Sequence, residues 1–141
     1  MKNNIKNDTI QFIKQQLSGY FSQHPDIVSA HVFGSVARKT EGKESDIDLA
    51  FLLEESTVNR YSPLDFIPKL EKKLGRQIDL VILNRAGELL KYQVRRTGIL
   101  IYEKKPEIRK RFELKGRKTY EDFLHLHKRH VKKVLYGDKN G

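Results

Sequence analysis

The residues best suited to chemistry in this sequence are three aspartates in apolar surroundings. Asp46 and Asp48 begin the stretch DIDLAFLL, and Asp79 is the second residue of the similar stretch IDLVIL. Residues two apart in a strand face the same side of a sheet, so Asp46 and Asp48 are expected to point the same way. Two carboxylates about 4 Å apart repel each other by roughly 4 kcal/mol at an effective dielectric constant of 20, so a positive charge must offset them.

A divalent metal ion is the favoured source of that charge. The expected strands hold few cations, and an all-oxygen ligand set favours Mg²⁺. The alternative is that these aspartates cap strand ends or form salt bridges with Arg38 or Lys39. An Asp-x-Asp pair occurs together with a third aspartate at the start of a parallel apolar strand. We therefore predict a metal site formed by Asp46, Asp48 and Asp79.

A Gly-Ser pair precedes the aspartates. Gly34 and Ser35 directly follow the apolar run 27–33. Glycine allows a ligand to approach the backbone closely, and free amides at a helix start suit a phosphate. A strand that ends in Gly-Ser is also a common turn, so the pair gains meaning only from the Asp-x-Asp that follows. No GxxxxGK[ST], GxGxxG, HExxH or GxSxG motif is present.

Apolar periodicity and turn residues predict the elements that must position these groups. The first helix is expected to be capped by Asn7 or Asp8 and to bury Ile10, Ile13, Leu17, Tyr20 and Phe21. Strands are expected at 27–33, 46–53, 78–83 and 99–102, and helices at 35–39, 62–74, 86–97 and after Pro106. The strand at 46–53 is apolar enough to be buried on both faces, and 78–83 is expected to be a further buried strand. The alternation predicts one α/β or α+β domain with a small sheet and a basic helical tail.

Composition narrows the class of protein. The 141 residues suit one domain, and the absence of cysteine excludes disulfide scaffolds, thiolate metal sites and cysteine nucleophiles. No apolar run resembles a signal peptide or a membrane span, so a cytoplasmic location is expected. The net charge is +10, of which residues 104–141 carry +8, with 13 basic and 5 acidic residues. A basic segment of this kind attracts polyanions or an acidic partner surface, or keeps a solvated helix soluble.

The stretch GSVARKTEGKESDIDL, residues 34–49, resembles the signature of the DNA polymerase β-like nucleotidyltransferase superfamily. In that signature Gly-Ser, a ten-residue spacer and Asp-x-Asp follow one another. The form Gly-Ser-x-Ala-Arg with Ser-Asp-x-Asp-Leu, in so short a chain, is similar to the minimal nucleotidyltransferase (MNT) proteins. Many of these are the antitoxins of HEPN/MNT toxin–antitoxin pairs. The resemblance covers about residues 10–103, which we expect to form the nucleotidyltransferase domain, with 104–141 as its basic helical extension.

The resemblance implies a mixed sheet, ATP with Mg²⁺, and transfer of a nucleoside monophosphate to a hydroxyl. The implied acceptor is a tyrosine of a partner HEPN ribonuclease, which AMPylation silences. Asp46, Asp48 and Asp79 match the three carboxylates of the family. Gly34 and Ser35 match its nucleotide-binding pair, and Arg38 and Ser45 lie in the same motif, where Arg38 either contacts phosphate or braces the loop.

The chemistry of the residues agrees with this implication. Two metal ions held by Asp46 and Asp48 would stabilise the attacking and leaving oxygens, and Asp79 would bind the metal nearer the acceptor and help to remove its proton. Two alternatives stay open. In the first, the chain is an enzyme that modifies a small molecule such as an antibiotic. In the second, it is a non-catalytic antitoxin that acts by binding alone. We expect residues 106–136 to help hold the partner; direct nucleic-acid binding by the basic tail is possible but not favoured, because aromatic residues are sparse there.

Overall fold

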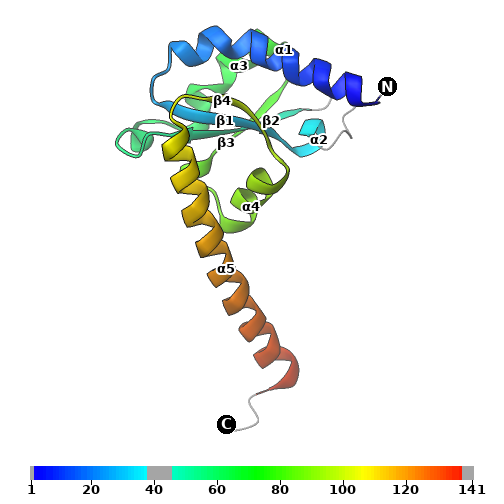
Figure 1. Cartoon of the computed structure of the whole chain (residues 1–141), viewed down its shortest axis with the longest axis vertical. Coiled ribbons are helices and arrows are strands. Elements are labelled where there is room, and N and C mark those ends of the chain that lie inside the picture. Colours follow the sequence, from blue (N-terminus) through cyan, green and yellow to red (C-terminus); the bar gives the residue numbers. More distant parts are fainter. Residues whose placement is uncertain (1, 38–45, 138–141) are drawn as a thin grey trace.

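The computed structural model describes residues 2–37 and 46–137 (Figure 1). Its helices are α1 (Lys2–Ser22), α2 (Gly34–Ala37), α3 (Ile67–Leu74), α4 (Glu88–Thr97) and α5 (Pro106–Tyr136), with short 3₁₀ turns at Val58–Arg60, Pro63–Asp65 and Leu83–Arg85. Its strands are β1 (Ile27–Phe33), β2 (Ile47–Leu53), β3 (Ile78–Ile82) and β4 (Ile99–Glu103).

The strands form one mixed sheet with the order β3-β2-β1-β4. β1 pairs antiparallel with both β2 and β4, whereas β2 and β3 are parallel. β2 and β3 begin at the end of the sheet where β1 finishes, so that end gathers the start of two strands and the turn into α2. This mixed α+β architecture is the predicted fold class.

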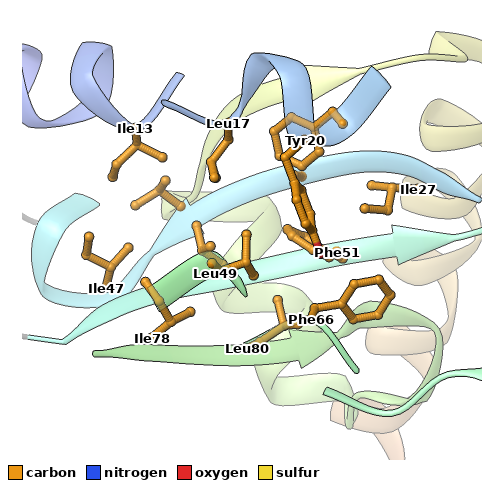
Figure 2. Close-up of a cluster of buried hydrophobic side chains, with 14 of the residues drawn as sticks. Ile13, Leu17, Tyr20, Ile27, Ile47, Leu49, Phe51, Phe66, Ile78 and Leu80 are labelled. Atoms are coloured by element: carbon orange, nitrogen blue, oxygen red, sulfur yellow. The ribbon is translucent and has the colours of Figure 1, made fainter. Parts of the chain in front are cut away.

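One face of the sheet carries the main hydrophobic core. Figure 2 shows Ile13, Leu17 and Tyr20 of α1 above Leu49 and Phe51 of β2. Phe66, Ile78 and Leu80 complete this core from below β2 in the same view. Alternate residues of a strand face opposite sides, so Ile47, Leu49, Phe51 and Leu53 of β2 all point into this layer with α1 and α3.

The other face is covered by α4 and the first half of α5 (Figure 1). A smaller core there joins Val28 of β1, Ala50 and Leu52 of β2, and Val94 of α4, with Ile108 and Phe112 of α5 packed against it. Every residue of β2 except Asp48 is buried. The expectation that this strand is covered on both faces is confirmed.

Several boundaries differ from the sequence predictions, and the largest differences are in α1 and in the stretch 62–74. α1 begins at Lys2, five residues before the predicted cap, although the five apolar residues predicted for its face are all buried. The predicted turn at 40–45 lies outside the described residues. The stretch 62–74 is a 3₁₀ turn followed by α3, whose first turn contains Pro68, and Gly75 ends it at φ 67°.

The prediction of a buried strand at 78–83 holds for one face of β3 only. β3 lies at the edge of the sheet, and its residues alternate between buried and more exposed positions, with Asp79 exposed and Val81 half-buried. Isoleucine and leucine fill the buried face, so the run reads as fully apolar although only one side is covered.

α5 is one helix with two different surroundings. Its first half contacts α4 and β1, and Gly116 is its last buried residue. From Glu121 to Tyr136 every residue is exposed, and this part projects away from the sheet as an arm (Figure 1). None of the described helices combines the length and the apolar character that a membrane span requires.

Candidate active site

Two of the three predicted carboxylates are direct neighbours across the parallel strands. Asp48 of β2 is paired with Asp79 of β3 in the sheet register. The register is set one residue earlier, where Ile47 pairs with Ile78 and the Ile47 amide donates a hydrogen bond to the Gln77 carbonyl at 3.0 Å. Paired side chains point to the same face. Both carboxylates therefore lie on the α4 side of the sheet, in phase with Ala50.

Asp46 comes one residue before β2 and is half-buried. Its spacing of two from Asp48 gives it the same side of the strand. Within residues 2–37 and 46–137, no three His, Cys, Asp or Glu side chains are close enough together to form a ready-made metal site. The structure thus places two carboxylates side by side and the third at the entrance to the same strand, without a closed ligand set.

Gly34 is packed directly against this pair. It ends β1 and starts α2 with φ +71°, and its predecessor Phe33 is the register partner of Asp48. A Cβ at position 34 would lie 2.0 Å from Oδ2 and 2.9 Å from Cγ of Asp48. Only glycine accommodates both the backbone angle and the carboxylate, so the backbone of the Gly-Ser turn and the Asp48 side chain share one small space.

The accessibility of the two paired carboxylates differs. Asp48 is half-buried in an interior strand, whereas Asp79 is exposed because β3 is an edge strand. A ligand that binds both carboxylates would contact Asp48 on the interior strand β2 and Asp79 on the edge strand β3.

The donor set fits a hard divalent cation. The site offers carboxylate oxygens from Asp48 and Asp79, with Asp46 in the same strand phase, and contains no sulfur ligand because the chain has no cysteine. The glycine at position 34 leaves room for the Asp48 carboxylate itself, because a Cβ there would lie 2.0 Å from its Oδ2. Mg²⁺ takes one or two carboxylates together with phosphate oxygens and keeps several waters, so it does not require a closed protein cage.

The remaining predicted site residues are less well placed by the structure. Ser35 is the second residue of α2 and directly follows Gly34, the residue whose Cβ position lies against the Asp48 carboxylate. Arg38 and Ser45 lie outside the described residues. Their nucleotide-binding roles stay predictions.

A pocket between α4 and α5 was not among the predicted sites. Tyr92, Arg95 and Arg96 of α4 line it together with Arg117, Tyr120 and Glu121 of α5. The rings of Tyr92 and Tyr120 are stacked, with centroids 4.3 Å apart. α4 continues through Gly98 into β4, where Ile99 pairs with Val32. The helix that carries these arginines therefore ends beside the C-terminal end of β1. Their signal in the sequence is the pair Arg95-Arg96 three residues after a tyrosine.

A polar cluster holds α5 against the sheet. His31 of β1 is buried, and its Nε2 lies 3.9 Å from Oε1 of Glu113. Arg109 forms ion pairs with two glutamates: its Nη1 lies 2.9 Å from Oε1 of Glu113, and its Nε lies 3.3 Å from Oε2 of Glu103. Burial lowers the pKa of His31, although the negative charge of Glu113 acts in the opposite direction. A neutral imidazole is therefore favoured in the folded protein.

Residues 15–107 match the family described as polymerase beta nucleotidyltransferase. This match spans more than half of the chain, so the protein belongs to that family and is a nucleotidyltransferase. It includes Gly34, the three aspartates and the whole sheet, and it ends within the first turn of α5.

Several solved structures with a similar fold come from toxin–antitoxin complexes. A chain from a crystal structure of a toxin–antitoxin with AMP-PNP is 24% identical, has a TM-score of 0.70, and is matched over 89% of this chain and 98% of its own length. A chain from the MntA–HepT toxin–antitoxin is 22% identical, with a TM-score of 0.65 over 92% of this chain and 98% of that one.

A third match comes from a tri-AMPylated HEPN toxin of Shewanella oneidensis in complex with MNT antitoxin. It is 20% identical, with a TM-score of 0.60 over 96% of this chain and 99% of that one. No curated protein matches the sequence. At these identities the matches show a shared fold, and they extend beyond residue 107 into α5.

Proposed function

We propose that this protein is a cytoplasmic antitoxin that transfers AMP from ATP to a tyrosine hydroxyl of a partner HEPN toxin and thereby neutralises it. The observation that carries the proposal is the register pair of Asp48 and Asp79, set against the positive-φ Gly34. The similar folds support the choice of partner, because they come from toxin–antitoxin complexes, one with AMP-PNP and one with an AMPylated toxin.

The proposed reaction is an in-line displacement at the α-phosphorus of ATP. The tyrosine oxygen forms a bond to that phosphorus while the bond to the bridging oxygen of the β-phosphate breaks. The products are a phenolic AMP ester and pyrophosphate. Asp46, Asp48 and Asp79 would hold Mg²⁺, which supplies charge stabilisation for the attacking and leaving oxygens.

The residues of the chain then have separate tasks. Asp79, at the exposed edge, receives the proton of the acceptor hydroxyl. The backbone at Gly34 and Ser35 approaches the triphosphate closely, because position 34 carries no side chain. Asp48 is held by the β1–β2 and β2–β3 ladders, so its carboxylate is oriented before the substrates arrive.

The test is an intact-mass measurement of the co-purified HEPN toxin. Purified protein, toxin, ATP and Mg²⁺ are incubated, and the toxin is weighed before and after the reaction. The expected result is a gain of one or more AMP units on the toxin, absent when EDTA is added, with the modified tyrosine located by peptide mapping. A toxin that is fully neutralised at unchanged mass would refute the proposed chemistry.

The Asp48→Asn variant separates catalysis from occlusion. It keeps the size of the side chain but removes its charge. If neutralisation depends on transfer, this variant binds the toxin and leaves its ribonuclease activity intact. If the variant still silences the toxin, the protein acts by binding alone.

A further inference from the structure

The arm of α5 has a surface that the catalytic reaction does not use. Four apolar residues and one histidine recur at the spacing 4-3-4-3 and form a seam: Tyr120, Leu124, His127, Val131 and Val134, with Phe123 and Leu135 at the flanks. A seam with a repeat of 3.5 residues is typical of a helix that packs along another helix. Val134 and Leu135 are 69% and 68% exposed. Nothing in the described part of the chain covers this seam beyond Tyr120.

The start of the same helix shows what such a seam does when it is covered. Ile108 and Phe112 pack into the smaller core with Val94, and Gly116 lies against the Arg95 guanidinium, where a Cβ would be 2.8 Å from Nη1. Tyr120 is the last residue of α5 to pack on α4, through its stacking on Tyr92. The fold therefore covers the apolar side of the first half of α5 with its own core and leaves the seam beyond Tyr120 open.

Charge indicates what covers the open half. Residues 123–137 contain four Lys or Arg residues and no Asp or Glu: Lys128, Arg129, Lys132 and Lys133. At the foot of the arm the pocket between α4 and α5 adds Arg95, Arg96 and Arg117, against one Glu121. A second copy of this chain would bring the same basic residues to this surface. An acidic helix complements both the seam and its basic borders.

We infer that the arm of α5, together with the arginine pocket at its foot, is the docking surface for an acidic helix of the toxin partner. The inference rests on the proposed function for the identity of that partner. The apolar seam supplies the contact area, and the arginines fix the direction of the docked helix. α4 ends beside the C-terminal end of β1, because Ile99 pairs with Val32, and the next residue of β1, Phe33, pairs with Asp48. Docking here therefore places the toxin near the end of the sheet that carries Asp48.

The seam is tested with neutral substitutions on opposite sides of the arm. Leu124→Gln and Val131→Gln remove apolar contacts from the seam, and His125→Gln makes a change of similar size at the neighbouring position, on the opposite face. The readout is the Kd for purified toxin by calorimetry. Each seam variant is expected to weaken binding about tenfold or more, while the control stays within about twofold. Equal affinities for all three variants would overturn the inference.

The pocket is tested by charge reversal. Arg96→Glu with Arg117→Glu changes two exposed arginines at the foot of the arm, and Lys72→Glu with Lys73→Glu makes the same charge change on α3, across the sheet. We expect only the first pair to weaken toxin binding strongly and to flatten the dependence of Kd on salt. A similar loss in both pairs would mean that overall charge, rather than this surface, holds the toxin.

Two other occupants give different results. If the seam joins two copies of this chain, sedimentation shows a dimer that Leu124→Gln dissociates. If the arm binds nucleic acid, the variants weaken binding of a single-stranded RNA oligonucleotide and leave the toxin Kd unchanged. Either result overturns the inference.

Failure of the inference and failure of the proposed function are distinguishable. Asp48→Asn is expected to lose AMP transfer and keep the wild-type Kd for toxin, whereas Leu124→Gln is expected to keep Mg²⁺-dependent ATP binding and lose affinity for toxin. Transfer that is absent in the wild-type protein refutes the function alone. Wild-type affinity in the arm variants refutes the docking surface alone.

Discussion

A Cβ atom at position 34 would lie 2.0 Å from Oδ2 of Asp48, although the two residues are separated by 13 others in the sequence. Gly75 provides a matched case without this conflict, because its φ of +67° is similar and nothing lies within 4 Å of its Cβ position. Substitutions at these two glycines therefore distinguish the effect of backbone strain from the effect on the Asp48 carboxylate.

Gly34→Ala and Gly75→Ala should both lower the free energy of unfolding by about 1–2 kcal/mol from the left-handed backbone alone. Only Gly34→Ala should also displace the Asp48 carboxylate, weaken Mg²⁺-dependent ATP binding and abolish transfer. Urea unfolding and nucleotide titration of both variants measure the two effects. Full transfer activity in Gly34→Ala would show that Asp48 does not need this position.

Asp48→Asn with Asp79→Asn should abolish transfer and leave the fold intact, or slightly more stable in metal-free buffer. The reason is that two neighbouring carboxylates repel each other when no cation is bound. We expect a fall in rate of roughly 10²-fold or more. Asp8→Asn, at an exposed position on α1, is the control. A variant that cannot fold would instead indicate that these aspartates hold the sheet together.

The first half of α5 should behave as part of the core. Phe112→Ala is expected to cost about 2 kcal/mol of unfolding free energy, because the ring packs on the cluster around Leu52 and Val94. Leu114→Ala, at a position 66% exposed on the same helix, should change stability by less than about 0.5 kcal/mol.

Truncation of α5 should show the same division. Truncation after Glu103 removes the residues that pack on the core and should destabilise the domain, whereas truncation after Asp122 should not. Thermal unfolding of the four variants tests this division.

Stability should fall as the pH is lowered below about 6.5, the ordinary pKa of histidine. Burial lowers the pKa of His31 in the folded protein, so the unfolded chain binds more protons in the range between the lowered and the ordinary value. Folding is then favoured above pH 6.5 and loses stability as the pH falls through the lowered pKa. Burial also lowers the pKa of His24, which adds a contribution of the same sign.

His31→Gln should reduce this pH dependence, and His24→Gln should reduce it separately. Urea unfolding at pH 7.5 and at pH 5.5 gives the two free energies to compare. An unchanged slope in the double variant would mean that other groups govern the acid response.

The sequence was sufficient to predict the four strands and the fold class, because the apolar runs and the residues that end them are local signals. Gly34 and Asp46 to Asp48 were recognisable for the same reason, since a short spacing defines the motif. The start of α1 was missed because residues 2–7 show no apolar periodicity. Their helical state follows from extension of the packed part of the helix.

Features that depend on contacts between distant segments were not predictable. IDLVIL reads as an interior strand, and only the strand order shows that β3 is an edge and that Asp79 is exposed. Likewise apolar residues of α5 continue past Tyr120, although the spacing of four residues from Ile108 through Phe112 and Gly116 becomes an alternation of four and three. The residue at which α5 stops packing on α4 depends on the length of α4. The sequence of α5 alone therefore does not reveal it.

The division of α5 also determines how its amides should exchange with solvent. Amides near Ile108 and Phe112 are tied to the core and should exchange only through global unfolding. Amides from Glu121 to Tyr136 have no packing to protect them and should open by fraying from the C-terminal end of the helix. Deuterium uptake along this one helix should therefore span nearly the whole range of protection found in the molecule, and toxin that docks on the arm should slow it in the outer half alone.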